Sequence, residues 1–303
     1  MYQYQYDSAA DLLRIANENH ISFADIAAAH EAEREETLAS DVFERMRVSL
    51  GVMKENIAAG IVSQAPSLGG LIGQNAAPMH TYAQTGKALS GELQSKAIAY
   101  ALAITEENAR MKRVVACPTA GACGVVPGCL ISLAELRGCD DNTIISGLLN
   151  ASAIGILITA GATISGAEGG CQAEVGAASA MAASAMVQME GGGPEQSVHA
   201  AAMALKNVLG LVCDPVAGLV EVPCSKRNAM GVANAAAAAD MALAGIQSVI
   251  PLDEVITAMK HVGQALPFEL KETARGGCAA TKTGKAIRRK VRARNERIIE
   301  DVE

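Results

Sequence analysis

Apolar residues recur at three- and four-residue spacing along most of this 303-residue chain, which is the period of an amphipathic helix. Ser22 and Asp25 resemble a capping box, and the charged, alanine-rich run after them predicts one or two long helices to about Ile61. The pattern predicts further helices over residues 90–111, 125–137, 141–164, 172–189, 195–211, 228–249 and 252–262.

Segments rich in Gly, Pro and Ser separate the predicted helices, at residues 62–86, 166–170, 191–194 and 213–225. Strand-length alternation of apolar and polar residues is scarce, and its best example, RVVACP, is short. We therefore predict an all-α fold. A compact helical domain over residues 62–303 would carry its site on Gly/Pro-rich loops, and a helical N-terminal arm over residues 1–61 would pack on it.

Composition indicates how the helices pack. Half of the residues are hydrophobic but only 3% are aromatic and none is Trp, so the core must consist of Ala, Leu, Ile, Val and Met. Small side chains of this kind favour closely packed helices. Residues 144–167 carry no charge and imitate a membrane span, but their Ser, Thr, Asn and Gly content favours a helix buried in a protein core.

Charge and targeting signals narrow the function classes. The net charge of -7 argues against a nucleic-acid surface, and we interpret the basic run at residues 282–294 as a solvated helix. The N-terminus lacks the pattern of a signal peptide, so we expect a cytoplasmic protein that does not bind membranes. In that compartment its eight cysteines are expected to be buried, catalytic or metal-binding rather than oxidised to disulfides.

Three cysteines lie six residues apart in ACPTAGACGVVPGC, namely Cys117, Cys123 and Cys129. This spacing differs from the two-residue gap of compact zinc and ferredoxin sites, and on a helix it directs the side chains to different faces. We interpret them as small buried residues around a glycine turn.

Three other cysteines each lie at a break marked by Gly or Pro: Cys171, Cys213 and Cys224. A cysteine in a loop or at a helix end can turn toward a metal while backbone amides donate to its sulfur. Three such ligands leave one metal position without a protein ligand, as Lewis-acid catalysis requires.

The motifs CPTAGACGVVPG, EGGCQAEVGAASAMAA, GLVCDPVAGLVEVPC and KRNAMGVANA together resemble the catalytic (alpha) chain of iron-sulfur-dependent L-serine dehydratases, over about residues 63–285. The resemblance implies that Cys171, Cys213 and Cys224 hold a 4Fe-4S cluster whose fourth iron is open. It also implies that L-serine is converted to pyruvate and ammonia, with the open iron acting as Lewis acid on the serine hydroxyl.

The same resemblance implies the residues that contact the substrate. The stretch PTAGACG is similar to the family's substrate loop, in which backbone amides and a hydroxyl group meet the substrate carboxylate. A Gly-rich segment at SLGG and the cation and amide after the third cysteine also match. A plain helix start with Ser225 as its N-cap is an alternative reading of the second match, and it is compatible with a functional role. The implied substrate-binding residues are Ser67, Gly69, Gly70, Thr119, Gly121, Ala122, Gly124, Arg227 and Asn228.

The base that removes the Cα proton stays open. His80 is the histidine in a Gly/Pro-rich loop, while Glu174 and Glu168 flank the first cluster cysteine. Members of the family also have a second part, fused or as a separate beta chain with SSHT-type histidine motifs, and that partner is a further source of the base. Cys278 stands where the family has an apolar residue, so it either occupies the open iron at rest or is a small buried residue.

Three alternatives remain. Pyridoxal phosphate enzymes perform the same elimination, but they are typically built on α/β sheets, which this pattern does not predict. A non-catalytic helical scaffold would need a closed, four-ligand metal site, whereas only three cysteines are well placed. The same cluster chemistry on L-cysteine or L-threonine stays open, because a methyl group changes binding by only a few kcal/mol.

Overall fold

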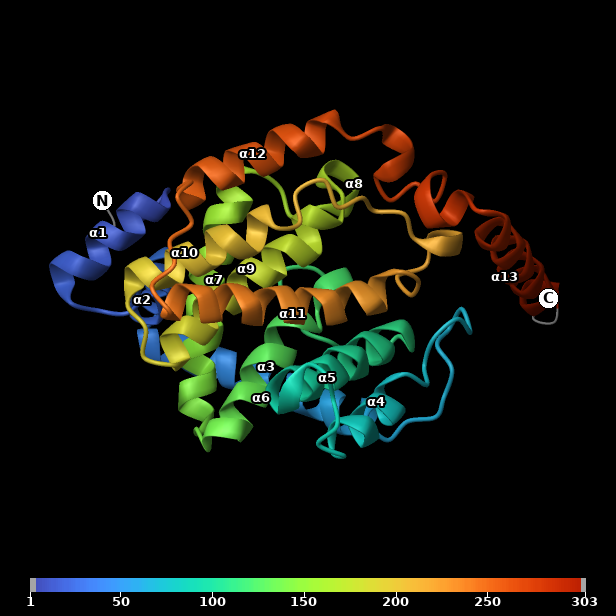
Figure 1. Cartoon of the computed structure of the whole chain (residues 1–303), viewed down its shortest axis with the longest axis horizontal. Helices are drawn as coiled ribbons and strands as arrows, with labels where there is room; N and C mark the ends of the chain where they lie inside the picture. The colour runs from blue at the N-terminus through green and yellow to red at the C-terminus, as the bar shows by residue number, and fades with distance from the viewer. Residues whose placement is uncertain (1–3, 301–303) are drawn as a thin grey trace.

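The computed structural model describes residues 4–300, and the side chains of residues 4–294. The regular structure in that range is helical without any β-strand, which confirms the all-α prediction (Figure 1). The α-helices are α1 (Ala9–Asn19), α2 (Phe23–Glu35), α3 (Ala39–Gly60), α4 (Ala76–Ala83), α5 (Gly91–Ala109), α6 (Val125–Arg137), α7 (Asp141–Gly161), α8 (Gly166–Gly169), α9 (Ala177–Met189), α10 (Pro194–Lys206), α11 (Cys224–Leu243), α12 (Leu252–Ala265) and α13 (Lys282–Glu300).

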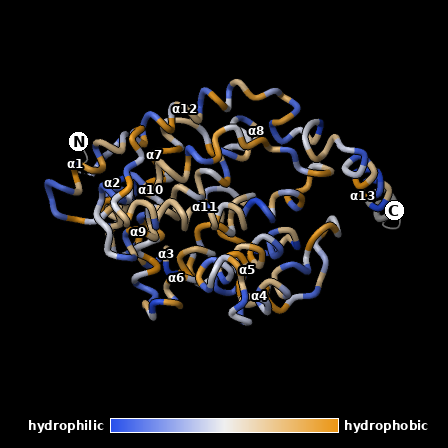
Figure 2. The backbone as a smooth tube through the Cα atoms, in the orientation of Figure 1, coloured by the Kyte–Doolittle hydropathy of each residue, from blue (hydrophilic) through white to orange (hydrophobic). Residues whose placement is uncertain are grey.

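Helix α9 lies at the centre of the packing, in contact with α6, α7, α10 and α11. Every residue from Ala177 to Val187 is buried, and most are Ala or Ser, so neighbouring helices approach closely. Figure 2 shows hydrophobic residues concentrated on these central helices, while α13 at the edge of the molecule is mostly hydrophilic. The alanine-rich core expected from composition is therefore confirmed.

The N-terminal helices join the same core. Leu12, Phe23 and Ile26 are among the largest fully buried side chains, and α2 packs along α7. The predicted capping box is present, because Ser22 Oγ accepts from the N–H of Asp25 and Asp25 accepts from the N–H of Ser22, both at 3.1 Å. The domain boundary after residue 61 stays a prediction.

Several local predictions need correction. The 62–86 segment is not all loop, because α4 forms over AAPMHTYA. At the start of this helix the Glu106 carboxylate accepts from the Asn75 N–H at 2.7 Å. The local sequence pattern does not show such a tertiary contact. Ser90 precedes α5 without making a side-chain cap. The 166–170 break contains the short helix α8, whereas RVVACP forms no strand, in agreement with the all-α prediction.

Within the described residues, two segments are long and apolar enough to cross a membrane by length and composition alone, Ala120–Arg137 and Asp141–Gly161. In these two segments 72% and 67% of the apolar window is buried inside the protein. The second covers most of the uncharged stretch at 144–167, and its burial is that of the expected core helix.

Candidate metal centre and active site

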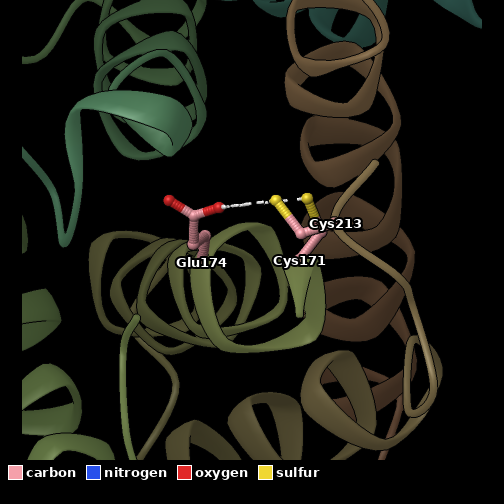
Figure 3. A group of neighbouring side chains, drawn as sticks. All are labelled: Cys171, Glu174 and Cys213. Atoms are coloured by element: carbon pink, nitrogen blue, oxygen red, sulfur yellow. Dashed lines mark hydrogen bonds between the residues drawn. The ribbon is translucent and has the colours of Figure 1, made fainter. Parts of the chain in front are cut away.

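Two of the predicted cluster cysteines converge with a carboxylate. Figure 3 shows Cys171 and Cys213 with their sulfur atoms directed toward the Glu174 side chain. The two Sγ atoms and a Glu174 carboxylate oxygen all lie within 4.8 Å of one another. Cysteine thiolates and a carboxylate in so small a volume are a donor set suited to a metal ion or cluster.

The local backbone explains this convergence. Cys171 directly precedes η2 (Gln172–Gly176), a π-helical turn that contains Glu174 and leads into α9. Turns of this kind are frequent at functional sites. Cys213 lies in the loop after α10, where its N–H donates to Leu270 at 2.8 Å and its carbonyl accepts from Glu272 at 2.8 Å. The segment that follows α12 therefore holds the Cys213 backbone in place.

The carboxylate of Glu174 lies in a confined position between the thiols and the PTAGACG loop. Thr119 Oγ1 donates to Glu174 Oε1 at 2.8 Å. A Cβ on Gly166 would lie 2.5 Å from Glu174 Oε2, so the absence of a side chain there leaves room for the carboxylate. Burial raises the pKa of Glu174 above its ordinary value.

The two converging thiols have pKa values shifted in opposite directions. The hydrogen bond with Cys213 and the nearby Arg227 guanidinium lower the pKa of Cys171. The same hydrogen bond with Cys171, together with burial, raises the pKa of Cys213. Cys171 is therefore the first of the two thiols to lose its proton and become a thiolate.

Cys224 borders this group without belonging to its most compact part. It is the first residue of α11, it is buried, and burial together with the charges of Cys171 and Glu174 raises its pKa to about 12. The neighbouring Ser225 Oγ is buried and has no hydrogen-bond partner in the described part of the chain. Three buried thiols beside an unpartnered hydroxyl fit a sulfur-ligated metal group.

Ser225 does not cap α11, contrary to the alternative weighed from sequence. The helix begins one residue earlier, at Cys224, so Ser225 lies within its first turn and is 1% exposed. Arg227, one turn into the helix, donates to Cys171 Sγ at 3.4 Å and pairs with Asp214 at 2.8 Å. A cation therefore lies directly against the cysteine sulfur.

Asn228 joins the PTAGACG loop to α11. Its Oδ1 accepts from the Gly124 N–H at 3.0 Å, and its Nδ2 donates to the Gly121 carbonyl at 2.7 Å. The Ala122 N–H donates to the Thr119 carbonyl at 3.2 Å, within the turn η1 (Ala120–Ala122). These contacts bring the loop, Glu174 and the cysteine segment into one site.

The SLGG segment also reaches the cysteine segment, through a residue that sequence reasoning missed. Glu221 Oε2 accepts from Ser67 Oγ at 2.6 Å, and Glu221 Oε1 accepts from the Gly69 N–H at 2.8 Å. Gly70 closes the turn by donating to the Ser67 carbonyl at 3.0 Å. The sequence feature that could have indicated Glu221 is its position as a single acid in the otherwise apolar run GLVEVPC. A carboxylate buried with such a run needs hydrogen-bond partners.

His80 lies elsewhere. It belongs to α4, its Nε2 is 3.1 Å from Gln84 Nε2, and its ring stacks on Tyr100 at 6.3 Å between centroids. With Lys96 and others it lines a surface pocket that contains none of the three cysteines and not Glu174. Glu168 is exposed, its carboxylate accepts from Thr163 Oγ1 at 2.7 Å, and it does not belong to the compact group of Cys171, Glu174 and Cys213. Of the base candidates in this chain, the structure brings Glu174 to the cysteines.

Of the five remaining cysteines, Cys139 is half-buried just after α6, and the other four fall into two groups. Cys117, Cys123 and Cys129 are buried in the core, as interpreted from their spacing, and burial raises the pKa of both Cys123 and Cys129 to about 12. Cys278 is exposed, so the buried alternative for it is wrong. Its N–H donates to Asp214 at 2.6 Å, which places it beside the Cys213 segment.

Comparison with known proteins identifies the family of this chain. Residues 18–279 match the family model described as serine dehydratase alpha chain. The chain is 49% identical over 286 residues to a probable L-serine dehydratase alpha chain of Bacillus subtilis (strain 168), covering 94% of this chain and 95% of the relative.

Two further relatives show the extent of the match. The L-serine dehydratase alpha chain of Peptoniphilus asaccharolyticus is 42% identical over 283 residues, 93% of this chain and 97% of the relative. The L-serine dehydratase of Streptomyces coelicolor is 39% identical over 286 residues, 91% of this chain but 61% of the relative. The chain therefore belongs to the serine dehydratase alpha chain family.

Proposed function

We propose that this chain is the catalytic chain of an L-serine dehydratase, a lyase that converts L-serine to pyruvate and ammonia. The observation that carries the proposal is the convergence of the Cys171 and Cys213 thiols with the Glu174 carboxylate, beside the loop that contains Thr119. Membership of the family supports an enzyme of the lyase class, and the relatives described above are named for L-serine dehydratase.

Cys171, Cys213 and Cys224 are proposed to hold a 4Fe-4S cluster. Such a cluster with one open iron would supply a Lewis acid for the serine hydroxyl. The three buried thiols and the unpartnered Ser225 hydroxyl support this assignment. Arg227 donates to the Cys171 sulfur and offsets part of the negative charge that sulfur ligands bring into a buried site.

The PTAGACG loop is proposed to bind the amino-acid substrate. Thr119 and Gly121 would make the direct contacts, because the N–H groups of Ala122 and Gly124 already donate within the protein. Thr119 Oγ1 would then exchange its hydrogen bond with Glu174 for one with the substrate carboxylate. Ala122, Gly124 and Asn228 then hold the shape of the loop. Anionic carboxylates are well matched to hydroxyl and amide donors in such turns.

Glu174 is proposed to accept the Cα proton at its carboxylate. Its position between Thr119 and the thiols supports this role, since a base must lie within hydrogen-bond reach of the proton that it removes. His80 receives no such support, because it lines a different pocket. A histidine of a partner chain remains the alternative to Glu174.

That partner is proposed to be a beta chain, in a complex of at least two chains in the cytoplasm. The alpha-chain names of the Bacillus subtilis and Peptoniphilus asaccharolyticus relatives support a separate second chain. The longer Streptomyces coelicolor relative supports it as well, because 39% of that protein has no counterpart in the match with this chain.

A metal and activity assay tests the proposal. The protein is purified under strict exclusion of oxygen, together with any chain that co-purifies, as the unaltered form, Cys213→Ala and Cys123→Ala. We expect about four iron atoms and four sulfides per chain, with pyruvate formed from L-serine, in the unaltered form and in Cys123→Ala. Both are lost in Cys213→Ala.

Other outcomes select other functions. Pyruvate from L-cysteine or 2-oxobutyrate from L-threonine at a higher kcat/KM than from L-serine would change the substrate. Iron bound without turnover of any of the three amino acids would favour the metal-binding scaffold. Iron lost in Cys123→Ala instead would move the metal site to the PTAGACG loop.

A further inference from the structure

We propose that Glu221 is a positioning residue that fixes the loop of residues 67–72 against the segment carrying Cys224. The role in serine binding rests on the proposed function, because it takes this loop as part of the substrate site. The fixing of the loop itself rests on contacts within the chain alone.

The Glu221 carboxylate is enclosed by donors from the loop. It is 3% exposed and accepts three hydrogen bonds, from Ser67 Oγ at 2.6 Å, the Gly69 N–H at 2.8 Å and the Leu71 N–H at 3.0 Å. Ser67 and Ile72 close the loop around it, because Ser67 N donates to the Ile72 carbonyl and Ile72 N donates to Ser67 Oγ. Within residues 4–294 no Lys or Arg forms an ion pair with Glu221, so in that range the direct partners of its carboxylate are these loop donors.

The close contact between the loop and the Glu221 carboxylate requires a glycine at position 69. A Cβ at that position would overlap the Leu219 side chain and lie 2.6 Å from Glu221 Oε1. Any other residue at position 69 would therefore push the loop away from the carboxylate. The lack of a side chain and the three donors both serve the same contact.

The backbone of Glu221 belongs to the segment that carries the third cysteine. Its carbonyl accepts from the Ser225 N–H at 3.1 Å at the start of α11, and Val222 accepts from the Val216 N–H at 2.8 Å. Cys224 follows three residues later. A displacement of either the loop or the cysteine segment therefore alters the contacts of the same carboxylate.

A second buried carboxylate binds the residues that directly follow the loop, and it provides a comparison for the role of Glu221. Glu106 accepts from the N–H groups of Gly73 and Asn75, at 3.2 and 2.7 Å. Glu106 belongs to α5, which carries none of the three cysteines. Of these two carboxylates, Glu221 is the one that joins the loop to the segment carrying Cys224.

The variant Glu221→Gln tests this role because it keeps the side-chain size. Gln has one oxygen acceptor and one NH2 donor, so it cannot accept from both Gly69 and Leu71, whose N–H groups flank the two carboxylate oxygens. One backbone N–H is left facing a second donor, and the loop should loosen. Glu55→Gln, with its side chain 73% exposed, is the matched control.

The first readout is hydrogen exchange of the metal-free chain, which needs no activity. We expect the peptide covering residues 67–72 to exchange at least about tenfold faster in Glu221→Gln than in the unaltered protein, with Glu55→Gln unchanged. Ser67→Ala removes one donor to the Glu221 carboxylate and leaves the Gly69 and Leu71 N–H donors in place. It should therefore speed exchange of the same peptide by a smaller factor. Unaltered exchange in both Glu221→Gln and Ser67→Ala would overturn the proposal.

The second readout separates positioning from general stability. In the iron-loaded complex we expect Glu221→Gln to raise KM for L-serine about tenfold with a smaller change in kcat, and to keep the iron content and visible absorption spectrum of the unaltered protein. Faster exchange with an unchanged KM would show that the loop does not serve substrate binding and would overturn that part. If the unaltered protein turns over no serine, the proposed function fails while hydrogen exchange still decides the contact.

Discussion

The guanidinium of Arg227 contacts the sulfur of Cys171, with Nη1 as donor at 3.4 Å. The same side chain pairs with Asp214, the residue that follows Cys213 in the chain. One arginine thus links two cysteine segments that lie 42 residues apart in the sequence, from 213 − 171. This arrangement places a cation where negative charge of sulfur ligands would gather, and it makes the stability of the site sensitive to a single side chain.

Replacing Arg227 by Met should destabilise the metal-free chain by about 3 kcal/mol, because it leaves the Asp214 carboxylate buried without its cationic partner. The two side chains are 15% and 3% exposed. The free energy of unfolding from urea titration measures the effect.

Arg113→Met is the matched control for that experiment. Arg113 pairs with Glu55 on the surface, where the side chains are 74% and 73% exposed, so its loss should cost under about 1 kcal/mol. Equal losses in the two variants would contradict the importance of the buried pair.

Substituting Gly166 by Ala should lower turnover of L-serine by roughly a hundredfold, because a misplaced catalytic group is costly. The new methyl group would lie 2.5 Å from Glu174 Oε2 and displace the carboxylate. Gly51→Ala in α3 has no atom within 4 Å of the added carbon, so it should leave turnover unchanged and slightly raise thermal stability. Steady-state kinetics on both variants give the comparison, and full activity in Gly166→Ala would count against a role for Glu174.

Cysteine reactivity should follow burial and pKa. Because burial raises the pKa of Cys123 and Cys129 to about 12, both stay protonated at neutral pH and should resist alkylation until pH rises toward 12 or the chain unfolds. Cys278 is exposed and should react first, although hydrogen bonding to Asp214 raises its pKa and slows it relative to a free thiol. Mass spectrometry after timed iodoacetamide treatment at pH 8 tests this order, and early labelling of Cys129 would contradict the packing.

Cys224→Ala tests the third assigned ligand. Cys224 lies outside the compact group of Cys171, Glu174 and Cys213, yet the proposal gives it equal standing as a ligand. We therefore expect its iron content after anaerobic reconstitution to fall as far as that of Cys213→Ala. Cys129→Ala, also buried, should retain its iron. Full iron in Cys224→Ala would leave the metal group with two cysteine ligands.

Sequence by itself determined the class of fold and the segments that matter. Helical periodicity and alanine-rich composition predicted the all-α architecture, and α6 has the predicted bounds, Val125–Arg137. These features could be read because a helix repeats its pattern over neighbouring residues. Family motifs drew attention to Cys171, Cys213 and Cys224, and two of these three thiols do converge.

Only the tertiary structure decided which side chains meet. The hydrogen bond between Ser67 and Glu221 joins residues 154 positions apart, and the one between Thr119 and Glu174 spans 55 positions. Glu106 likewise accepts from the Asn75 N–H at the start of α4, and α4 places His80 against Tyr100. Partners so distant in sequence leave no local periodic signal, because the packing of whole helices determines which loops come together.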